Sequence, residues 1–338
     1  MIGAPKSRNS FAPDWKWVAF AAAVLALVLL VLRLSGAGKA PAPQAVAVPL
    51  PARSDAGPMA TLGATAPSSA PFVFRGPLPP APARGLVEES GEGPLPVIAA
   101  DGRQPWQVYA RPFAQSGRRP RVAIVISGLG LSTLETLKAL SELPPEVTLS
   151  FLPAAGNTAR WLSQARRKGH ETLLDLSLEP VDDPRQYVGP HTLFASLEPR
   201  QNLERLDWVM SRGTGYIGLA TYMGEHFARS PEELRPILGE LKKRGLAFFD
   251  ARTTGVGPAM ALASELDLPH AGALRVLDAE VSTRAVFAVL ASLERLAKTH
   301  GSAIGIGSAY PETITAVTRW AKRPKGVALA PLSALLRR

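Results

Sequence analysis

From residue 121 onward, short apolar runs alternate with longer amphipathic stretches. A continuous apolar run is typical of a strand covered on both faces, as in a parallel sheet. Such runs lie at residues 122–126, 147–151, 172–176, 216–219, 246–249, 274–277, 303–306 and 327–329. The stretches between them predict helices, among them residues 132–140, 158–168, 231–244 and 283–299. The alternation over residues 121–338 therefore predicts one α/β domain, a distorted (β/α) barrel of seven or eight strands.

The first part of the chain has a different pattern. Residues 17–32 are all apolar, and a helix over residues 17–34 would span roughly 27 Å, enough to cross a bilayer core. Lys6, Arg8 and Lys16 lie before this helix, so residues 1–16 are expected in the cytoplasm and the large domain in the periplasm. This predicts a single-pass protein of a bacterial inner membrane. The alternative is a signal peptide cleaved after Ser35-Gly-Ala37, but the apolar run is longer than the roughly 7–15 residues of a signal core.

Residues 35–96 are rich in alanine, proline and glycine and show no apolar period. Such a segment buries too little surface to offset its chain entropy, so an extended, disordered linker is expected. Residues 97–120 are richer in aromatic side chains, including Trp106, Tyr109 and Phe113. We expect this aromatic arm to pack on the domain. The alternative is a docking motif for an envelope protein partner.

The charge balance limits the classes of partner. The chain has 38 Lys and Arg against 28 Asp and Glu, a net charge of +10. Its basic clusters are spread over several predicted helix ends and are not interleaved with aromatic residues, so no nucleic-acid groove is expected. The inner-membrane surface or an acidic envelope polymer fits this charge better. The absence of cysteine excludes thiol catalysis, zinc–thiolate sites and disulfides.

Several short motifs follow one another in a definite order. The most informative is residues 169–180, which read Gly-His-Glu, an apolar strand containing Asp175, then Leu-Glu-Pro. The others are Ser127-Gly-Leu-Gly130, Phe151-Leu-Pro153, Gly189-Pro-His191, Thr221-Tyr-Met-Gly224, Asp250-Ala-Arg252-Thr253 and Gly307-Ser308. Together they resemble the motifs of the divergent polysaccharide deacetylases, a branch of the NodB-like carbohydrate esterases. The resemblance covers residue 121 to the C-terminus and implies a barrel of the deacetylase type.

The resemblance implies metal-assisted hydrolysis of an N-acetyl group, in which a divalent metal polarises the amide and activates a water molecule. The family has an aspartate pair and three histidines where this chain has Ser127 and Gly128, then Asp175, Tyr222 and Ser308. Serine, glycine and tyrosine do not replace carboxylate and imidazole ligands, so we expect no metal cofactor. Zinc would need a site rebuilt from relocated side chains, namely His226 with Glu225, Asp175, Glu179 and Asp250.

At the carboxyl ends of the predicted strands, polar side chains remain that suit sugar hydroxyls and a sugar's apolar face. These candidate substrate-binding residues are Asp175, Ser177, Glu179, Thr221, Tyr222, Glu225, Asp250, Arg252 and Ser308. We expect Asp175, Glu179, Tyr222 and Asp250 to line one cleft, with Asp175 and Asp250 as the catalytic candidates if hydrolysis persists. In a purely structural role, Asp250 would pair with Arg252 and Glu179 would cap backbone amides.

The leading interpretation is a membrane-anchored periplasmic pseudoenzyme that binds cell-envelope polysaccharide or peptidoglycan. The sequence leaves two alternatives open. One is an active N-deacetylase with an atypical site. The other is an envelope scaffold that binds proteins through the linker or the aromatic arm.

Overall fold

The computed structural model describes residues 74, 76–114, 119–180, 189–224, 227, 230–252 and 257–337. The expected cytoplasmic tail, the expected anchor at residues 17–34 and most of the expected linker lie outside this part of the chain. Among the described residues, no helix is both long and apolar enough to cross a membrane.

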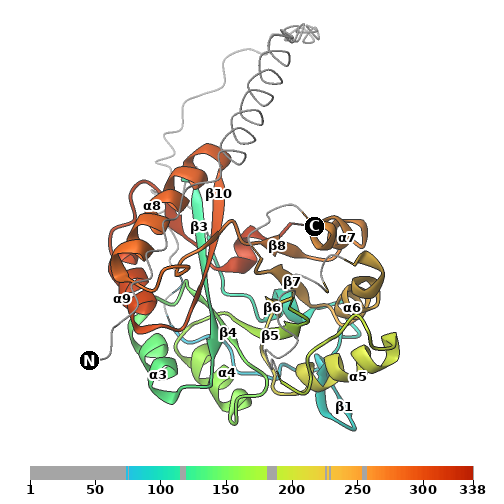
Figure 1. Ribbon diagram of the computed structural model, residues 1–338. Helices are drawn as coiled ribbons and strands as arrows, with labels where there is room; N and C mark the ends of the chain where they lie inside the picture. Colours follow the sequence, from blue (N-terminus) through green and yellow to red (C-terminus); the bar gives the residue numbers. More distant parts are fainter. Residues whose placement is uncertain are drawn as a thin grey trace, which may run out of the picture. The chain divides into compact units, whose positions relative to one another are not determined.

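A curled parallel sheet forms the centre of the domain (Figure 1). Its strands follow the order β8-β7-β6-β5-β4-β3-β10-β9, and the short strand β11 pairs with the start of β3. The strands are β3 (Arg121–Leu129), β4 (Thr148–Phe151), β5 (Thr172–Leu178), β6 (Gly218–Met223), β7 (Ala247–Asp250), β8 (His270–Gly272), β9 (Arg275–Val276), β10 (Ser302–Ser308) and β11 (Ala328–Leu329). The predicted α/β barrel architecture is confirmed, as an open half-barrel in which the described edge strands β8 and β9 do not pair.

Helices lie around the outside of the sheet (Figure 1). They are α3 (Thr133–Glu142), α4 (Thr158–Arg167), α5 (Pro199–Met210), α6 (Pro231–Lys243), α7 (Pro258–Glu265), α8 (Thr283–His300) and α9 (Pro311–Ala321). The α3 helix begins where Ser132 accepts a hydrogen bond from the backbone N–H of Glu135. The α6 helix begins with Pro231, followed by two glutamates near the positive end of the helix dipole.

The central strands are apolar on both faces because the sheet is covered on both sides. In β3, Ile124 and Ile126 belong to the core between sheet and helices, whereas Ala123 and Val125 belong to a second core on the other face of the sheet. This second core also contains Leu86 and Tyr109 from the N-terminal segment, together with Leu332 and Leu335 from the 3₁₀ helix η2 (Leu332–Leu335). The two ends of the described domain therefore complete its interior.

The segment around Arg111 and the C-terminal segment around Ser333 meet at the amino ends of the strands. Glu171, which precedes β5, is buried and accepts hydrogen bonds from the N–H groups of Arg111 (3.0 Å) and Ser333 (3.0 Å). Further along, the backbone groups of Arg337 and His270 form an antiparallel bridge on β8. Glu171 thus links the incoming arm to the C-terminal tail.

The expected linker is wrong for residues 76–96. This segment includes a hairpin of β1 (Val87–Ser90) and β2 (Gly93–Pro96), and it buries Leu78, Leu86 and Leu95. In the adjoining range, which includes α2 (Pro105–Val108), Tyr109 and Arg111 are buried. These three leucines show neither helical nor strand periodicity in the sequence. The reason is that the segment forms no core of its own but packs against the rest of the domain.

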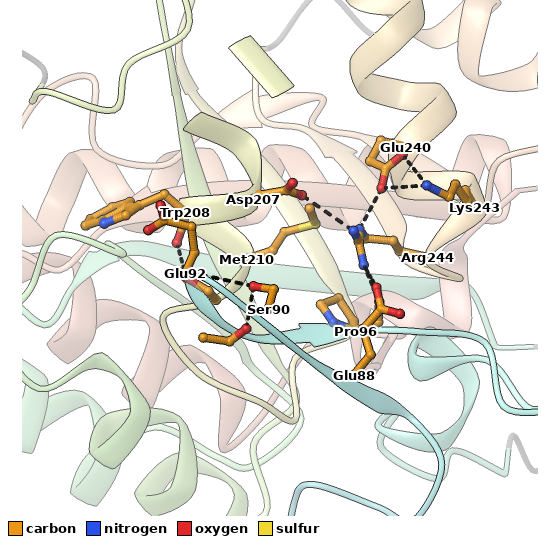
Figure 2. A network of polar contacts seen from close by, with 12 residues as sticks. Glu88, Ser90, Glu92, Pro96, Asp207, Trp208, Met210, Glu240, Lys243 and Arg244 are labelled. Carbon is orange, nitrogen blue, oxygen red and sulfur yellow. Dashed lines mark hydrogen bonds and ion pairs between the residues drawn. The ribbon is translucent and has the colours of Figure 1, made fainter. Parts of the chain in front are cut away.

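Arg244, the C-cap residue of α6, fixes this hairpin in place, as Figure 2 shows. Its guanidinium pairs with Glu88 on β1 at 2.9 Å and donates a hydrogen bond to the carbonyl of Pro96 on β2 at 3.0 Å. The same group pairs with Glu240 on α6 at 2.7 Å and faces Asp207 on α5 at 3.6 Å. Because Arg244 is buried, loss of its charge would leave several acceptors without a partner.

We predict that Arg244→Met lowers the free energy of unfolding by roughly 1–3 kcal/mol, because it removes a largely buried guanidinium whose partners Glu88 and Asp207 are themselves partly exposed. The measurement is urea denaturation followed by tryptophan fluorescence. Arg235→Met is the matched control, since Arg235 forms an exposed pair with Glu265 at 2.8 Å and its loss should leave stability nearly unchanged. Equal effects of the two substitutions would contradict the role of Arg244 as the clamp of the hairpin.

Candidate functional site

A hollow of about 460 Å³ opens at the carboxyl ends of β3, β6 and β10. Strand register brings the ends of β3 and β10 together, with Ser308 paired to Ser127. The lining residues are Ser127, Gly128, Leu131, Ser132, Glu135, Thr136, Leu152, Tyr222, Ser308, Ala309, Tyr310 and Pro311. Four positions singled out from the sequence, Ser127, Gly128, Tyr222 and Ser308, therefore meet in one hollow.

Asp175 is fully buried and does not line this hollow. Its carboxylate accepts hydrogen bonds from the hydroxyls of Ser127 (2.9 Å) and Ser150, and from the N–H of Gly128 (2.9 Å). Gly128 has a φ of 78°, a conformation that glycine adopts without strain. Burial raises the pKa of the Asp175 carboxyl, while these hydrogen bonds act in the opposite direction.

Tyr222 presents a half-buried ring to the hollow. Burial raises the pKa of its phenol, and the nearby groups Asp175 and Tyr310 raise it further. The hydroxyl therefore stays protonated at neutral pH and can donate as well as accept hydrogen bonds. Tyr310, which is 45% exposed, supplies a second ring at the rim.

Asp250, Arg252 and Thr221 form a separate cluster that does not line the hollow. Arg252 binds both carboxylate oxygens of Asp250, at 2.8 and 2.7 Å. The hydroxyl of Thr221 accepts a hydrogen bond from the N–H of Ala251 at 2.8 Å. This geometry matches the structural alternative from the sequence, in which Asp250 and Arg252 form an ion pair that holds a loop.

Glu179 and Ser177 hold the loop that follows β5. The side chain of Glu179 accepts a hydrogen bond from the N–H of Ala195 at 2.8 Å, and the carbonyl of Ser177 accepts one from the N–H of Leu193 at 3.0 Å. Of Asp175, Glu179, Tyr222 and Asp250, which were expected to share one cleft, Tyr222 lines this hollow, whereas Asp175 and Asp250 are buried. Glu225, His226 and Thr253 lie outside the described residues.

The sequence analysis missed Asp278, which lies after β9 and is nearly buried. Its carboxylate accepts hydrogen bonds from the N–H of Ser308 (2.6 Å) and the hydroxyl of Thr313 (2.8 Å), and burial raises its pKa. Asp278 thus positions the end of β10 at the hollow. No motif marks it, since it follows a strand of only two residues.

Residues 124–336 match the family described as divergent polysaccharide deacetylase. The chain belongs to this family. An uncharacterized protein from Agrobacterium tumefaciens with a known crystal structure is 39% identical, and the alignment covers 72% of this chain and 99% of that one with a TM-score of 0.69. Two more relatives are uncharacterized proteins. The Haemophilus influenzae protein is 27% identical, with coverage of 60% of this chain and 70% of its own, and YibQ of Escherichia coli is 23% identical, with coverage of 64% and 67%.

The described residues that line the hollow do not include the ligand set of a catalytic zinc. Its lining offers hydroxyls, one carboxylate from Glu135 and backbone groups, and no imidazole. The carboxylate of Asp175 already accepts three hydrogen bonds. Within the described ranges, no group of three or more His, Asp or Glu residues could hold a metal ion. A borderline metal such as zinc needs about three nitrogen, sulfur or carboxylate ligands around one point.

We predict that Asp175→Ala destabilises the fold by roughly 2–4 kcal/mol, because three donors lose their acceptor. Asp175→Asn should cost much less, since its amide oxygen can accept from Gly128 while its NH₂ group donates to the serine hydroxyls. Urea denaturation of the three proteins measures the difference.

The same set of proteins tests the titration of Asp175. In the unfolded chain this carboxyl ionises near pH 3.8, whereas burial raises its pKa in the fold. Its contribution to stability is therefore complete below the unfolded pKa and is lost as the pH rises through the folded pKa. The unfolding free energy of wild type minus that of Asp175→Asn should fall from about pH 4 upward and then level off. A difference that does not change with pH would contradict the raised pKa.

Proposed function

We propose that this chain is a glycan-binding protein of the cell envelope that retains the deacetylase fold without hydrolysis. The observation that carries the proposal is the chemistry of the hollow. Where the family pattern has metal ligands, the chain has two serine hydroxyls, a glycine and a tyrosine. The carboxylate at the remaining position, Asp175, is buried and accepts three hydrogen bonds.

The hollow has the mixed character that a sugar ring requires. Ser127, Ser308 and Tyr222 offer hydroxyl groups, while Leu131 and Tyr310 offer apolar surface. A sugar presents hydroxyls around its edge and C–H groups on its face, so a tyrosine ring can cover the face while hydroxyls bind the edge. The volume of about 460 Å³ is within the range of small-ligand sites.

The proposed setting follows from the N-terminal sequence. An apolar run at residues 17–32, preceded by basic residues, supports an inner-membrane anchor with the domain in the periplasm. Cell-envelope polysaccharide or peptidoglycan would be the glycan within reach. The net charge of +10 favours polymers that carry negative groups.

We predict that Tyr222→Ala weakens binding of chito-oligosaccharides or peptidoglycan fragments by roughly 1–3 kcal/mol, because it removes a half-buried ring and a hydroxyl from the lining of the hollow. Isothermal titration calorimetry measures the change, and thermal unfolding checks that the variant is folded. Val281→Ala is the control, since Val281 is exposed and does not line the hollow. Glycan binding that is unaffected by Tyr222→Ala would refute this site. Steady acetate release would instead support an active deacetylase.

We also predict that a chelator leaves the melting temperature of the protein unchanged. A metal held only by the folded state would add its binding free energy to stability, so its removal would lower the melting temperature. Differential scanning fluorimetry with EDTA, and then with added zinc, makes the comparison. A fall of several degrees that zinc reverses would show a metal site and overturn the non-catalytic proposal.

A further inference from the structure

One leucine just before α3 and two on α3 are exposed to solvent. Leu131 is 69% exposed, Leu134 73% and Leu137 48%. Within the described part of the chain, the other large apolar side chains with comparable exposure are Val276, Val281 and Tyr310. Single exposed leucines are common on protein surfaces, but a row along one helix marks an interaction site. We refer to Leu131, Leu134 and Leu137 as the leucine ridge.

A hollow of about 780 Å³ adjoins this ridge between α3 and α4. Leu134, Leu137 and Leu140 form its apolar part. We refer to it as the α3–α4 hollow. Leu134 and Leu137 belong both to the leucine ridge and to the wall of this hollow, and such an apolar groove suits a helix as its partner.

The charged residues that line the α3–α4 hollow indicate which kind of helix could bind there. The α4 side of the α3–α4 hollow consists of Gln164, Arg167 and Lys168, so this side is basic. On the α3 side, Lys138 is paired with Glu142 at 3.1 Å. A matching helix should therefore combine leucines with acidic residues. The α3 helix itself has this character, because Glu135 remains as an acidic residue beyond the Lys138–Glu142 pair.

We propose that two copies of this chain associate through α3, packed antiparallel about a two-fold axis. In this arrangement the leucine ridge of each copy enters the α3–α4 hollow of the other. The surface is self-complementary, since one molecule carries both the basic hollow and the acidic apolar helix, and a two-fold axis satisfies both at once. A flat lipid surface would match the basic residues but would leave the hollow unfilled and bring Glu135 and Glu142 toward anionic head groups.

The association would also affect the candidate glycan site. Leu131 belongs to the leucine ridge, and Leu131, Ser132 and Glu135 line the hollow beside Tyr222. The partner copy would therefore lie at the rim of that hollow. The pairing itself does not require glycan binding, so the two proposals can fail separately.

Cysteine cross-linking of the full-length chain tests the pairing, because the chain has no cysteine of its own and an introduced thiol is unique. Leu134→Cys and Leu137→Cys are expressed separately and together in bacteria, and the membranes are treated with a mild oxidant. We expect at least one of these samples to form disulfide-linked dimer at ten or more times the level of Val281→Cys, an exposed control away from α3. Dimer no stronger than this control would overturn the proposal.

Charge reversal tests the complementarity. In the Leu134→Cys or Leu137→Cys chain that cross-links, Arg167→Glu should lower the dimer yield several-fold, and Glu135→Arg in the same chain should restore it. Arg295→Glu, at an exposed position on α8, is the matched control and should have no effect. A yield unchanged by Arg167→Glu would contradict the arrangement. If no dimer forms, the pairing is overturned. Sedimentation of the protein with anionic vesicles, if Leu134→Asp abolishes it, would then assign the leucine ridge to a membrane surface.

Discussion

The region at the carboxyl ends of the central strands depends on the hydrogen bonds of one buried carboxylate, that of Asp175. It joins three neighbouring strands, since its donors are Ser127 and Gly128 on β3 and Ser150 on β4. A carboxylate in an apolar interior is costly unless its oxygens are satisfied. The serines are therefore part of the same adaptation as the aspartate. At the position where the family resemblance implies a histidine, this chain has an aspartate that accepts hydrogen bonds from two hydroxyls and a backbone N–H.

The opposite end of the strands is organised by a second buried carboxylate, that of Glu171. It contacts the N-terminal arm, the C-terminal tail and the hydroxyl of Thr148 on β4. Buried carboxylates thus stabilise the domain at both ends of the strands, Glu171 at the amino ends and Asp175 toward the carboxyl ends. Polar groups at the amino ends hold chain segments together, while those at the carboxyl ends leave Tyr222 and Ser308 accessible, the arrangement typical of (β/α) barrels.

The sequence was sufficient for the sheet and for part of the site. Apolar runs predicted the main strands because both faces of a parallel strand are buried. The edge was less predictable: one strand was expected at residues 274–277, but the structure has two short strands, of which β8 begins at His270. Edge strands of two or three residues have too few positions to show a pattern.

The site residues likewise divide into those that the sequence could place and those that it could not. Ser127, Tyr222 and Ser308 could be placed together because each ends a strand. The burial of Asp175 could not be predicted, since its partner Ser127 lies 48 residues away in the chain. Tyr310 and Glu135 were missed because they enter the hollow from helix starts, and the placement of a helix against a sheet depends on packing that one sequence does not reveal.

The C-terminal tail has a consequence for how the protein folds. Its contacts reach Thr148, Glu171 and His270, which lie far back in the chain. Leu332 and Leu335 fill the same core as Leu86 and Tyr109. The barrel interior therefore remains incomplete while the last residues are still being synthesised. Contacts of such long sequence separation slow folding and keep apolar surface exposed in the meantime. The core is complete only once residues 332–337 are in place, so removal of this segment would affect the whole fold.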